Sequence, residues 1–223
     1  MGPSNRGTGS VLVPRRGVGR GGSVAHASGS VMKVIEVAAG IIAHEGRYLI
    51  ARRLGLGDAF AEDLLMAAPM HDVGKLGIPD AILLKPGRLT PEEFAVMKRH
   101  PQIGHDILKD SSSSILRLGA TIALTHHEKF DGSGYPHGLA GESIPIEGRI
   151  VAVADVFDAL TSARPYKPAW PMSRAVALLR EGRGTHFDPA CVDALFHAWD
   201  QVLSVQMRYQ DEHEPEAPFA PAG

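Results

Sequence analysis

The side chains best suited to chemistry in this sequence are four histidines and two aspartates, all of types that bind metal ions. They occur in the order His71, Asp72, His100, His126, His127 and Asp155. Imidazole and carboxylate together favour borderline divalent ions such as Fe, Mn, Zn or Ni, whereas calcium prefers oxygen ligands alone. Neighbours on a helix diverge by about 100°, so the adjacent pair suits a cation cluster at a helix end, with the aspartate carboxylate free to bridge two ions. The six residues therefore predict a metal site.

Helices are expected to position these residues. Apolar residues recur at helical spacing over 34–54 and again over 58–71, and Asp58 could cap the second helix. Two glycines soon after residue 72 end this helix, so the adjacent His-Asp pair is expected near a helix C-terminus. A capping box at 90–93 opens another helix that runs to His100.

The later candidates also lie on or beside predicted helices. Pro101 bends the chain so that His100 can point inward. The apolar run over 150–160 fits a buried strand or a buried helix, and its two aspartates, three residues apart, favour the helix. The other predicted helices cover 115–125, 173–180 and 189–207, the last capped by Asp188. No internal repeat and no pair of strands is expected, so the predicted fold class is all-α.

Composition limits the class of protein. The net charge of −2 and the pI of about 6.6 predict no general attraction to nucleic acid or to an anionic membrane. The single cysteine, Cys191, excludes an internal disulfide framework and a Cys-based zinc ribbon, and fits a reducing cytosol. No apolar run approaches the roughly 18 residues that span a bilayer, and no hydrophobic signal core begins the sequence. A cytoplasmic protein without a membrane anchor is expected.

One domain is predicted over 31–207, because 223 residues with 44% apolar side chains suffice for one core. Residues 1–30 form a tail rich in Gly, Ser and Arg, and residues 208–223 form an acidic, Pro-rich tail. Neither tail can bury enough apolar surface to order itself, so both termini are expected to be disordered.

Ordered motifs along the chain resemble one known family. The motifs are His71-Asp72-x-Gly-Lys75, His100-Pro101, His126-His127-Glu128, Asp131-Gly-x-Gly-Tyr135-Pro136 and Ala154-Asp155-Val156-Phe157-Asp158-Ala159-Leu160-Thr161. Together they are similar to the HD-GYP domain, a branch of the HD metal-dependent phosphohydrolases, and the match covers about 60–205. Taken singly, each histidine would fit an ordinary surface or helix-end residue, whereas the ordered set favours metal ligands.

The resemblance implies a helical bundle of about seven helices, a site for two or three metal ions, and hydrolysis of cyclic di-GMP to linear pGpG, with GMP as the alternative end product. The residues suit a pair of divalent transition-metal ions, Fe or Mn in preference to Zn or Ni, with Asp72 as the expected bridge. Two such ions can supply a bridging hydroxide and neutralise the phosphoryl oxygens of a phosphodiester. The chemistry of the residues therefore agrees with the resemblance.

The resemblance also assigns roles to residues outside the ligand set. Lys75 is expected to be catalytic together with Asp72, because its ammonium can meet a phosphate oxygen as a compact charge. Arg164 and Lys167 match positions that hold the second phosphate. The Tyr135 ring could stack on guanine, or its loop could contact a partner such as a GGDEF-type diguanylate cyclase.

Two acidic residues leave alternatives open. Asp158 is placed behind the ligands, where its carboxylate could orient a histidine or anchor a loop, and direct contact with a metal ion is the equal alternative. Glu128 could be a ligand or could support one.

One position departs from the family pattern. The family usually places a further histidine, often with a glutamate one turn before it, on the helix that precedes residues 54–56. Those positions here hold Ala39 and Ile35, which cannot bind metal, and the nearest histidine, His44, is five residues further on. A shorter first helix could bring His44 or Glu45 into the site, but absence of this ligand is the simpler expectation. The departure puts one metal position, and with it full activity, in question.

Three functions therefore stay open. The first is a working cyclic di-GMP phosphodiesterase. The second is a catalytically impaired HD-GYP module that senses a nucleotide or binds a diguanylate cyclase. The third is an HD enzyme for another nucleotide, such as a dNTP or an alarmone, against which the Gly134-Tyr135-Pro136 loop argues.

Overall fold

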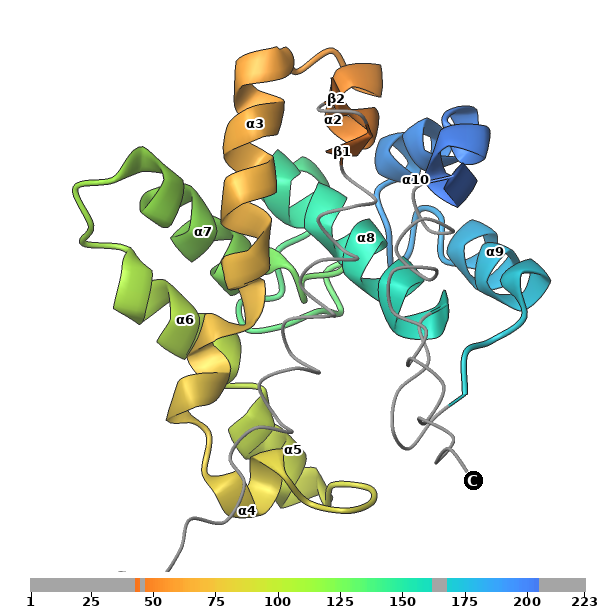
Figure 1. The fold of residues 1–223 in the computed structure, drawn as a ribbon. Helices are drawn as coiled ribbons and strands as arrows, with labels where there is room; N and C mark the ends of the chain where they lie inside the picture. The colour runs from red at the N-terminus through yellow and green to blue at the C-terminus, as the bar shows by residue number, and fades with distance from the viewer. Residues whose placement is uncertain (1–42, 45–46, 162–167, 205–223) are drawn as a thin grey trace, which may run out of the picture.

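Helices are the main elements of the part of the chain that the computed structural model describes, which is residues 43–44, 47–161 and 168–204 (Figure 1). The α-helices are α2 (Leu49–Arg53), α3 (Asp58–Ala67), α4 (Asp80–Leu83), α5 (Pro91–Met97), α6 (His100–Leu108), α7 (Ser114–Thr125), α8 (Ile146–Thr161), α9 (Met172–Glu181) and α10 (Pro189–His197). The 3₁₀ helices are η1 (Ala68–Gly77) and η2 (Gly141–Ser143). The predicted all-α class is confirmed, and two of the described α-helices, α2 and α4, have only five and four residues. No described helix is long and apolar enough to cross a membrane.

The helix predicted over 34–54 is wrong for the first described residues. Ala43–His44 (β1) and Arg47–Tyr48 (β2) form a short antiparallel pair, and a helix begins only at Leu49. Gly46 lies between the two strands in the sequence, and glycine is a residue that tight hairpin turns favour. The helical spacing of apolar residues therefore did not reveal this local strand pair. Residues before 43 lie outside the described part of the chain.

The apolar core forms around α8, which lies at the centre of Figure 1 with α3 and α7 on one side and α9 and α10 on the other. The largest side chains that are fully buried in it include Leu64, Ile122, Ile150, Phe157, Leu179 and Leu195. Neighbours on several sides explain why the sequence of α8 is almost continuously apolar. The predicted choice of helix over strand for 150–160 is confirmed.

The His-Asp motif lies in η1, a 3₁₀ helix that directly follows α3, rather than at the C-terminus of an α-helix. η1 packs against α6 and α7. A Cβ atom on Gly74 would lie 1.9 Å from the carbonyl oxygen of His100 and 2.4 Å from the backbone nitrogen of Gly104. Only glycine permits this approach, which brings the motif of η1 against the start of α6.

Helix ends partly follow the predictions. The capping box of Thr90 and Glu93 and the Asp188 cap of α10 are confirmed. Asp58 is not a cap, because Gly57 holds that position and the Asp58 carboxylate pairs with Arg52 at 3.0 Å. The helix predicted over 189–207 is interrupted after His197.

Candidate metal centre

The six predicted ligands come from four neighbouring elements. His71 and Asp72 lie in η1, His100 begins α6, His126 and His127 follow α7, and Asp155 lies in α8. One ligand atom from each of Asp72, His100, His126 and His127 lies within 4.8 Å of all the others. The fold therefore gathers residues that are up to 55 positions apart into one cluster.

Asp72 faces a different set of partners with each carboxylate oxygen. Its Oδ1 lies 3.3 Å from Nε2 of His100 and 3.9 Å from Nε2 of His126. Its Oδ2 lies 3.4 Å from Nε2 of His71, and that nitrogen is 3.7 Å from Oδ1 of Asp155. The carboxylate thus stands between two groups of donor atoms, which is the arrangement expected of a residue that bridges two cations.

Three of the histidine rings are fastened by one nitrogen and leave the other unpaired. Nδ1 of His71 donates to the Ala68 carbonyl at 2.8 Å, and Nδ1 of His100 donates to the Met97 carbonyl at 2.8 Å. Nδ1 of His126 donates to the Ala123 carbonyl at 3.0 Å. The Nε2 atoms of these three rings are buried and have no hydrogen-bond partner. In His100 and His126 the backbone carbonyl on Nδ1 fixes the tautomer in which Nε2 carries a lone pair, and the same tether aims Nε2 of His71 at the carboxylates, so the three rings fit metal ligands.

The electrostatics of the cluster also suit a cation. Burial and the neighbouring histidines lower the pKa of His126 well below its ordinary value and that of His127 to about 3, and burial lowers the pKa of His100. Burial acts against ionisation of Asp72 as well, but the neighbouring His71 and Lys75 hold its pKa far below the usual range. Neutral imidazoles beside an ionised carboxylate form a donor set for divalent metal.

His71 differs from the other three histidines. Burial, the largest single influence, lowers its pKa, but Asp72 and Asp155 together outweigh burial and raise the pKa to about 9. The separation of 3.4 Å between its Nε2 and Oδ2 of Asp72 is that of a close ion pair rather than a hydrogen bond. A cation at this position would take the place of the proton that His71 holds.

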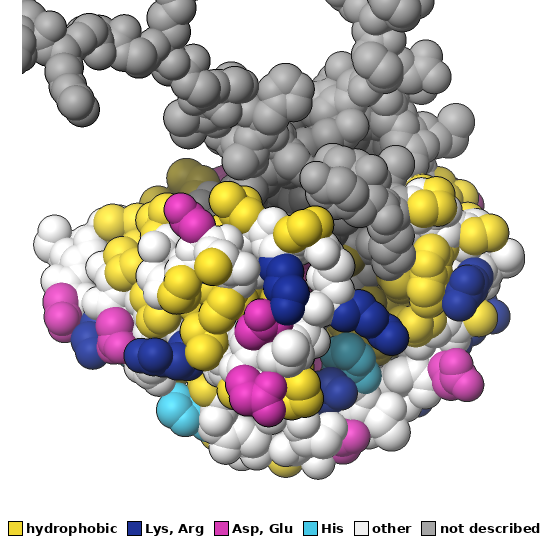
Figure 2. Space-filling view, turned by 90° about the horizontal axis from the view of Figure 1, so that it is seen from below, with side chains coloured by type: hydrophobic (Ala, Val, Ile, Leu, Met, Phe, Trp, Pro, Cys, Tyr) yellow, Lys and Arg dark blue, Asp and Glu magenta, His cyan; other side chains and the backbone are white. Residues whose placement is uncertain are grey.

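Lys75 lies one turn after Asp72 and pairs with it. Its Nζ donates to Oδ2 of Asp72 at 2.5 Å, and 40% of its side chain is exposed. Figure 2 shows one histidine side chain set back among Lys and Arg side chains on the face seen from below. Basic side chains beside a site attract an anionic ligand.

Glu128, which the sequence left open, anchors the following loop. Its buried carboxylate accepts hydrogen bonds from the backbone nitrogens of His137 at 2.7 Å and Leu139 at 3.0 Å. A Cβ atom on Gly134 would lie 2.3 Å from the backbone nitrogen of Lys129, so the loop closes tightly on the residues after His127. Both oxygens of Glu128 are therefore engaged by backbone donors, and its role is to support the site.

Tyr135 sits on this loop against the cluster. Its ring stacks on that of His127 at 4.8 Å between centroids, with 26° between the planes. Sequence reasoning did not find two further neighbours of this ring, Phe94 and Lys98, which come from the exposed face of α5. Their helical spacing of four was the signal, but nothing linked α5 to the loop before the fold was known.

The remaining predicted residues lie behind or beyond the described site. Asp158 is fully buried in α8, one turn beyond Asp155. The backbone of His44 lies in β1. Arg164, Lys167 and Glu45 lie outside the described residues.

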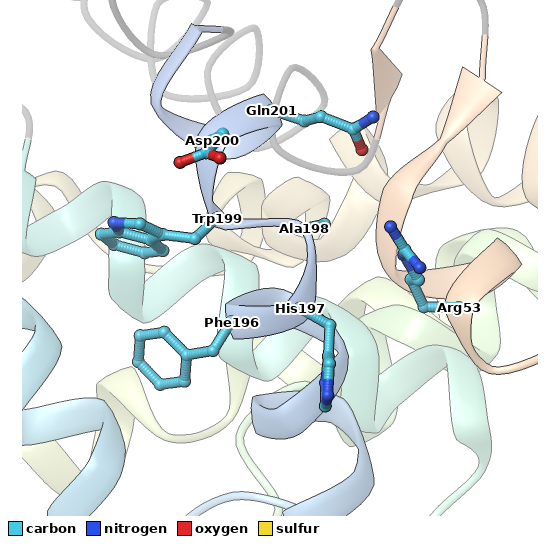
Figure 3. A pocket seen from close by; sticks show the side chains of 7 residues that line it. All are labelled: Arg53, Phe196, His197, Ala198, Trp199, Asp200 and Gln201. Atoms are coloured by element: carbon cyan, nitrogen blue, oxygen red, sulfur yellow. The ribbon is translucent and has the colours of Figure 1, made fainter.

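A separate hollow of about 350 Å³ lies beside α10 and contains none of the predicted site residues (Figure 3). Its walls are Arg53, Phe196, His197, Ala198, Trp199, Asp200 and Gln201. Only one histidine and one carboxylate line it, so the clustered metal donors, rather than the hollow, mark the candidate site.

Comparison with known proteins places this geometry in a family. A family model described as HD domain matches residues 36–191. The cyclic di-GMP phosphodiesterase response regulator RpfG of Xanthomonas campestris pv. campestris is 58% identical over 157 residues, which cover 70% of this chain and 42% of that relative. A cyclic di-GMP phosphodiesterase of Thermotoga maritima is 52% identical over 163 residues, which cover 73% of this chain and 44% of that relative. The chain thus spans less than half the length of these two relatives.

A solved structure agrees on the fold. An HDG"Y"P protein from Bdellovibrio bacteriovorus matches with a TM-score of 0.55 and 22% identity, over 75% of this chain and 51% of that chain. The family model covers more than half of the chain, including every element that carries the histidine cluster. The chain therefore belongs to the HD domain family, and the resemblance to its HD-GYP branch is confirmed.

Proposed function

We propose that this chain is a metal-dependent phosphodiesterase that hydrolyses cyclic di-GMP to linear pGpG, with GMP as the alternative end product. One observation carries the proposal. Three buried imidazole nitrogens without a hydrogen-bond partner converge on the two oxygens of the Asp72 carboxylate. The names of the relatives support the choice of substrate, since both are cyclic di-GMP phosphodiesterases. The single buried cysteine fits a cytoplasmic enzyme.

The residues would hold two divalent ions, with Fe or Mn favoured over Zn or Ni. His100, His126 and His127 would hold the first with Oδ1 of Asp72. His71 and Asp155 would hold the second with Oδ2 of Asp72. When bound, such ions neutralise the charge on phosphoryl oxygens and lower the pKa of a coordinated water.

The side chains around the donors orient the substrate. The Lys75 ammonium is partly exposed and lies on Asp72, where it can turn from the carboxylate to a phosphate oxygen that arrives beside it. Arg164 and Lys167, beyond the described residues, are proposed to hold the second phosphate. The half-buried Tyr135 is proposed to stack on guanine, or to present its loop to a GGDEF-type diguanylate cyclase.

The proposal calls on no ligand from the first helix, where the family usually supplies one. The described cluster gathers four histidines and two carboxylates without any contribution from residues before 43. This donor set is sufficient for two ions that share a carboxylate.

A second candidate function is favoured by Ala39 and Ile35, which stand where the family carries a metal ligand. If that ligand is essential, the chain is a catalytically impaired module that binds nucleotide or a partner protein through the Tyr135 loop.

Anaerobic turnover of cyclic di-GMP by protein loaded with Fe(II) or Mn(II) tests the proposal, with chromatographic separation of substrate, pGpG and GMP. Asp72→Ala should abolish product formation, while the exposed His197→Gln serves as a matched control that should retain it. Absence of product from folded, metal-loaded wild-type protein would reject the proposed phosphodiesterase activity. A pull-down in which Tyr135→Ala loses a diguanylate cyclase and Asp72→Ala keeps it would then support the second candidate.

A further inference from the structure

The ring of His127 is held differently from those of the other three histidines. His71, His100 and His126 each donate from Nδ1 to the backbone carbonyl three residues earlier. In the described part of the chain, no hydrogen bond reaches the ring of His127. Its orientation must therefore come from packing.

Aromatic rings supply that packing. His126 lies 4.0 Å and His100 lies 5.0 Å from the His127 ring, between centroids, and both belong to the ligand set. Tyr135 is the one described ring outside the ligand set that contacts His127, in a nearly parallel stack at 4.8 Å. The backbone nitrogen of Tyr135 also donates to the His127 carbonyl at 3.2 Å. Tyr135 thus contacts His127 through both its main chain and its side chain.

The Tyr135 ring is in turn held from α5. Phe94 meets it edge to face at 6.5 Å between centroids. The Lys98 ammonium lies 5.2 Å from the Tyr135 centroid and 4.9 Å from the Phe94 centroid. Phe94 is 45% exposed, yet it is placed against this ring rather than in the core. Attraction of the ammonium to both rings favours this position of the Tyr135 ring.

We propose that Tyr135 is a positioning residue for the metal centre. Its ring sets the direction of the His127 imidazole toward Asp72, and Phe94 and Lys98 of α5 hold the ring in place. The inference rests on the metal site of the proposed function but not on its substrate. Loss of the ring should free the imidazole to rotate, and loss of a residue that orients a metal-bound histidine typically weakens metal affinity by about 10- to 100-fold.

Cobalt(II) titration of metal-free protein, without any nucleotide, tests this directly. The visible absorption bands of Co(II) report the number and symmetry of its ligands, and the titration gives the affinity. Tyr135→Leu should weaken Co(II) binding by about 10-fold and shift the spectrum toward that of His127→Gln. Tyr135→Phe keeps the ring and should match wild type.

A double-mutant cycle shows whether Tyr135 acts through His127. In the His127→Gln background, Tyr135→Leu should have no further effect on Co(II) affinity or spectrum. Equal, additive losses in the two backgrounds would overturn the inference, as would a wild-type spectrum and affinity in Tyr135→Leu. Failure of wild-type protein to bind Co(II) would also overturn it.

A second variant leaves the loop sequence unchanged. Phe94→Leu combined with Lys98→Gln should weaken Co(II) binding less than Tyr135→Leu does, while Lys109→Gln on the exposed surface should not weaken it. If Tyr135→Leu does not fold, wild-type affinity in the α5 variant overturns the inference and a loss supports it. If the cobalt results hold but cyclic di-GMP is not hydrolysed, only the proposed function fails.

Discussion

Nε2 of His71 faces Oδ2 of Asp72 at 3.4 Å, on the opposite side of the carboxylate from His100. Substitution of an aspartate that bridges two ions should therefore lower the metal content more than substitution of a histidine that binds only one of them. Asp72→Asn should remove both ions, because the amide nitrogen cannot bind metal and the remaining oxygen carries little charge. His71→Gln should remove one ion and leave the site of His100, His126 and His127 occupied.

Metal analysis of protein purified with excess Mn(II) measures this difference. Wild-type protein should hold about two ions per chain, as a two-ion site of this kind requires. Retention of wild-type metal content by Asp72→Asn would contradict the bridging role. Equal losses in both variants would instead indicate that the two positions fill cooperatively.

Acid should destabilise the metal-free protein through His127. Its pKa is about 3 in the folded chain and about 6.5 when the chain is unfolded. Between these values the unfolded state binds a proton that the folded state does not, so the free energy of unfolding falls as the pH is lowered from 6.5 toward 3. Urea unfolding at several pH values in the presence of a chelator measures how steeply the free energy of unfolding depends on pH. His127→Gln should make this dependence weaker.

His71 should act with the opposite sign in the same metal-free protein. Its pKa is raised to about 9, so its contribution to stability is fully present below 6.5 and is lost as the pH rises through 9. His71→Gln should therefore reduce the loss of stability on the alkaline side. If His71→Gln leaves the alkaline pH dependence of the free energy of unfolding unchanged, the carboxylates of Asp72 and Asp155 do not hold a proton on His71.

Glu128→Gln should loosen the loop that it anchors. The amide keeps one acceptor but turns a donor group toward a backbone N–H, so one of the bonds to His137 and Leu139 is lost at a cost of about 1–3 kcal/mol. Amide hydrogen exchange of these two residues should accelerate, while exchange in α8 should not change. The exposed Glu142→Gln is the control, and equal exchange in both variants would show that the carboxylate is not the anchor.

Gly74→Ala should destabilise the fold more than an ordinary glycine substitution. The new methyl group would meet the His100 carbonyl oxygen at 1.9 Å, and backbone on both sides cannot move away cheaply. We expect a loss of at least about 3 kcal/mol, the upper end of the usual cost of overpacking. Gly141→Ala, at a φ of 57° with no atom near its Cβ, should lose about 1–2 kcal/mol. Equal losses, measured by urea unfolding, would contradict the close approach of η1 to α6.

Lys75→Met should impair turnover without changing metal content. Removal of one preorganised group that stabilises developing charge usually lowers kcat by about 100- to 1,000-fold. Steady-state kinetics on cyclic di-GMP, together with metal analysis, separate this effect from loss of ions. Lys109→Met on the exposed surface should behave as wild type. Full activity of Lys75→Met would restrict Lys75 to a structural partner of Asp72.

The candidate ligands and most helices around the site could be predicted from the sequence, but the contacts that hold the ligands in place could not. The histidines and aspartates could be found because their types are rare in apolar helical surroundings, and Thr90 and Asp188 could be found because caps act over three residues. The strand pair before α2 was missed because each strand has two residues and carries no alternation of its own.

Contacts between distant residues were beyond a reading of the sequence. Glu128 satisfies backbone groups nine and eleven residues away, and backbone groups have no side-chain signature. Phe94 and Lys98 reach Tyr135 only through the tertiary packing of α5 against the loop. The need for Gly74 likewise arises from the carbonyl of His100, which lies 26 residues later.

The bonds from three histidine rings to backbone carbonyls set limits on how the chain can change in length. Each of these rings donates to the carbonyl three residues before it, so one residue inserted between Met97 and His100, at the junction of α5 and α6, would turn the ring away and break this hydrogen bond. The segment between α6 and α7 carries no such constraint, because it changes the distance between helices rather than the phase of either one. Insertions should therefore be tolerated near Ser112, and single-residue insertions just before any of the three tethered histidines should not.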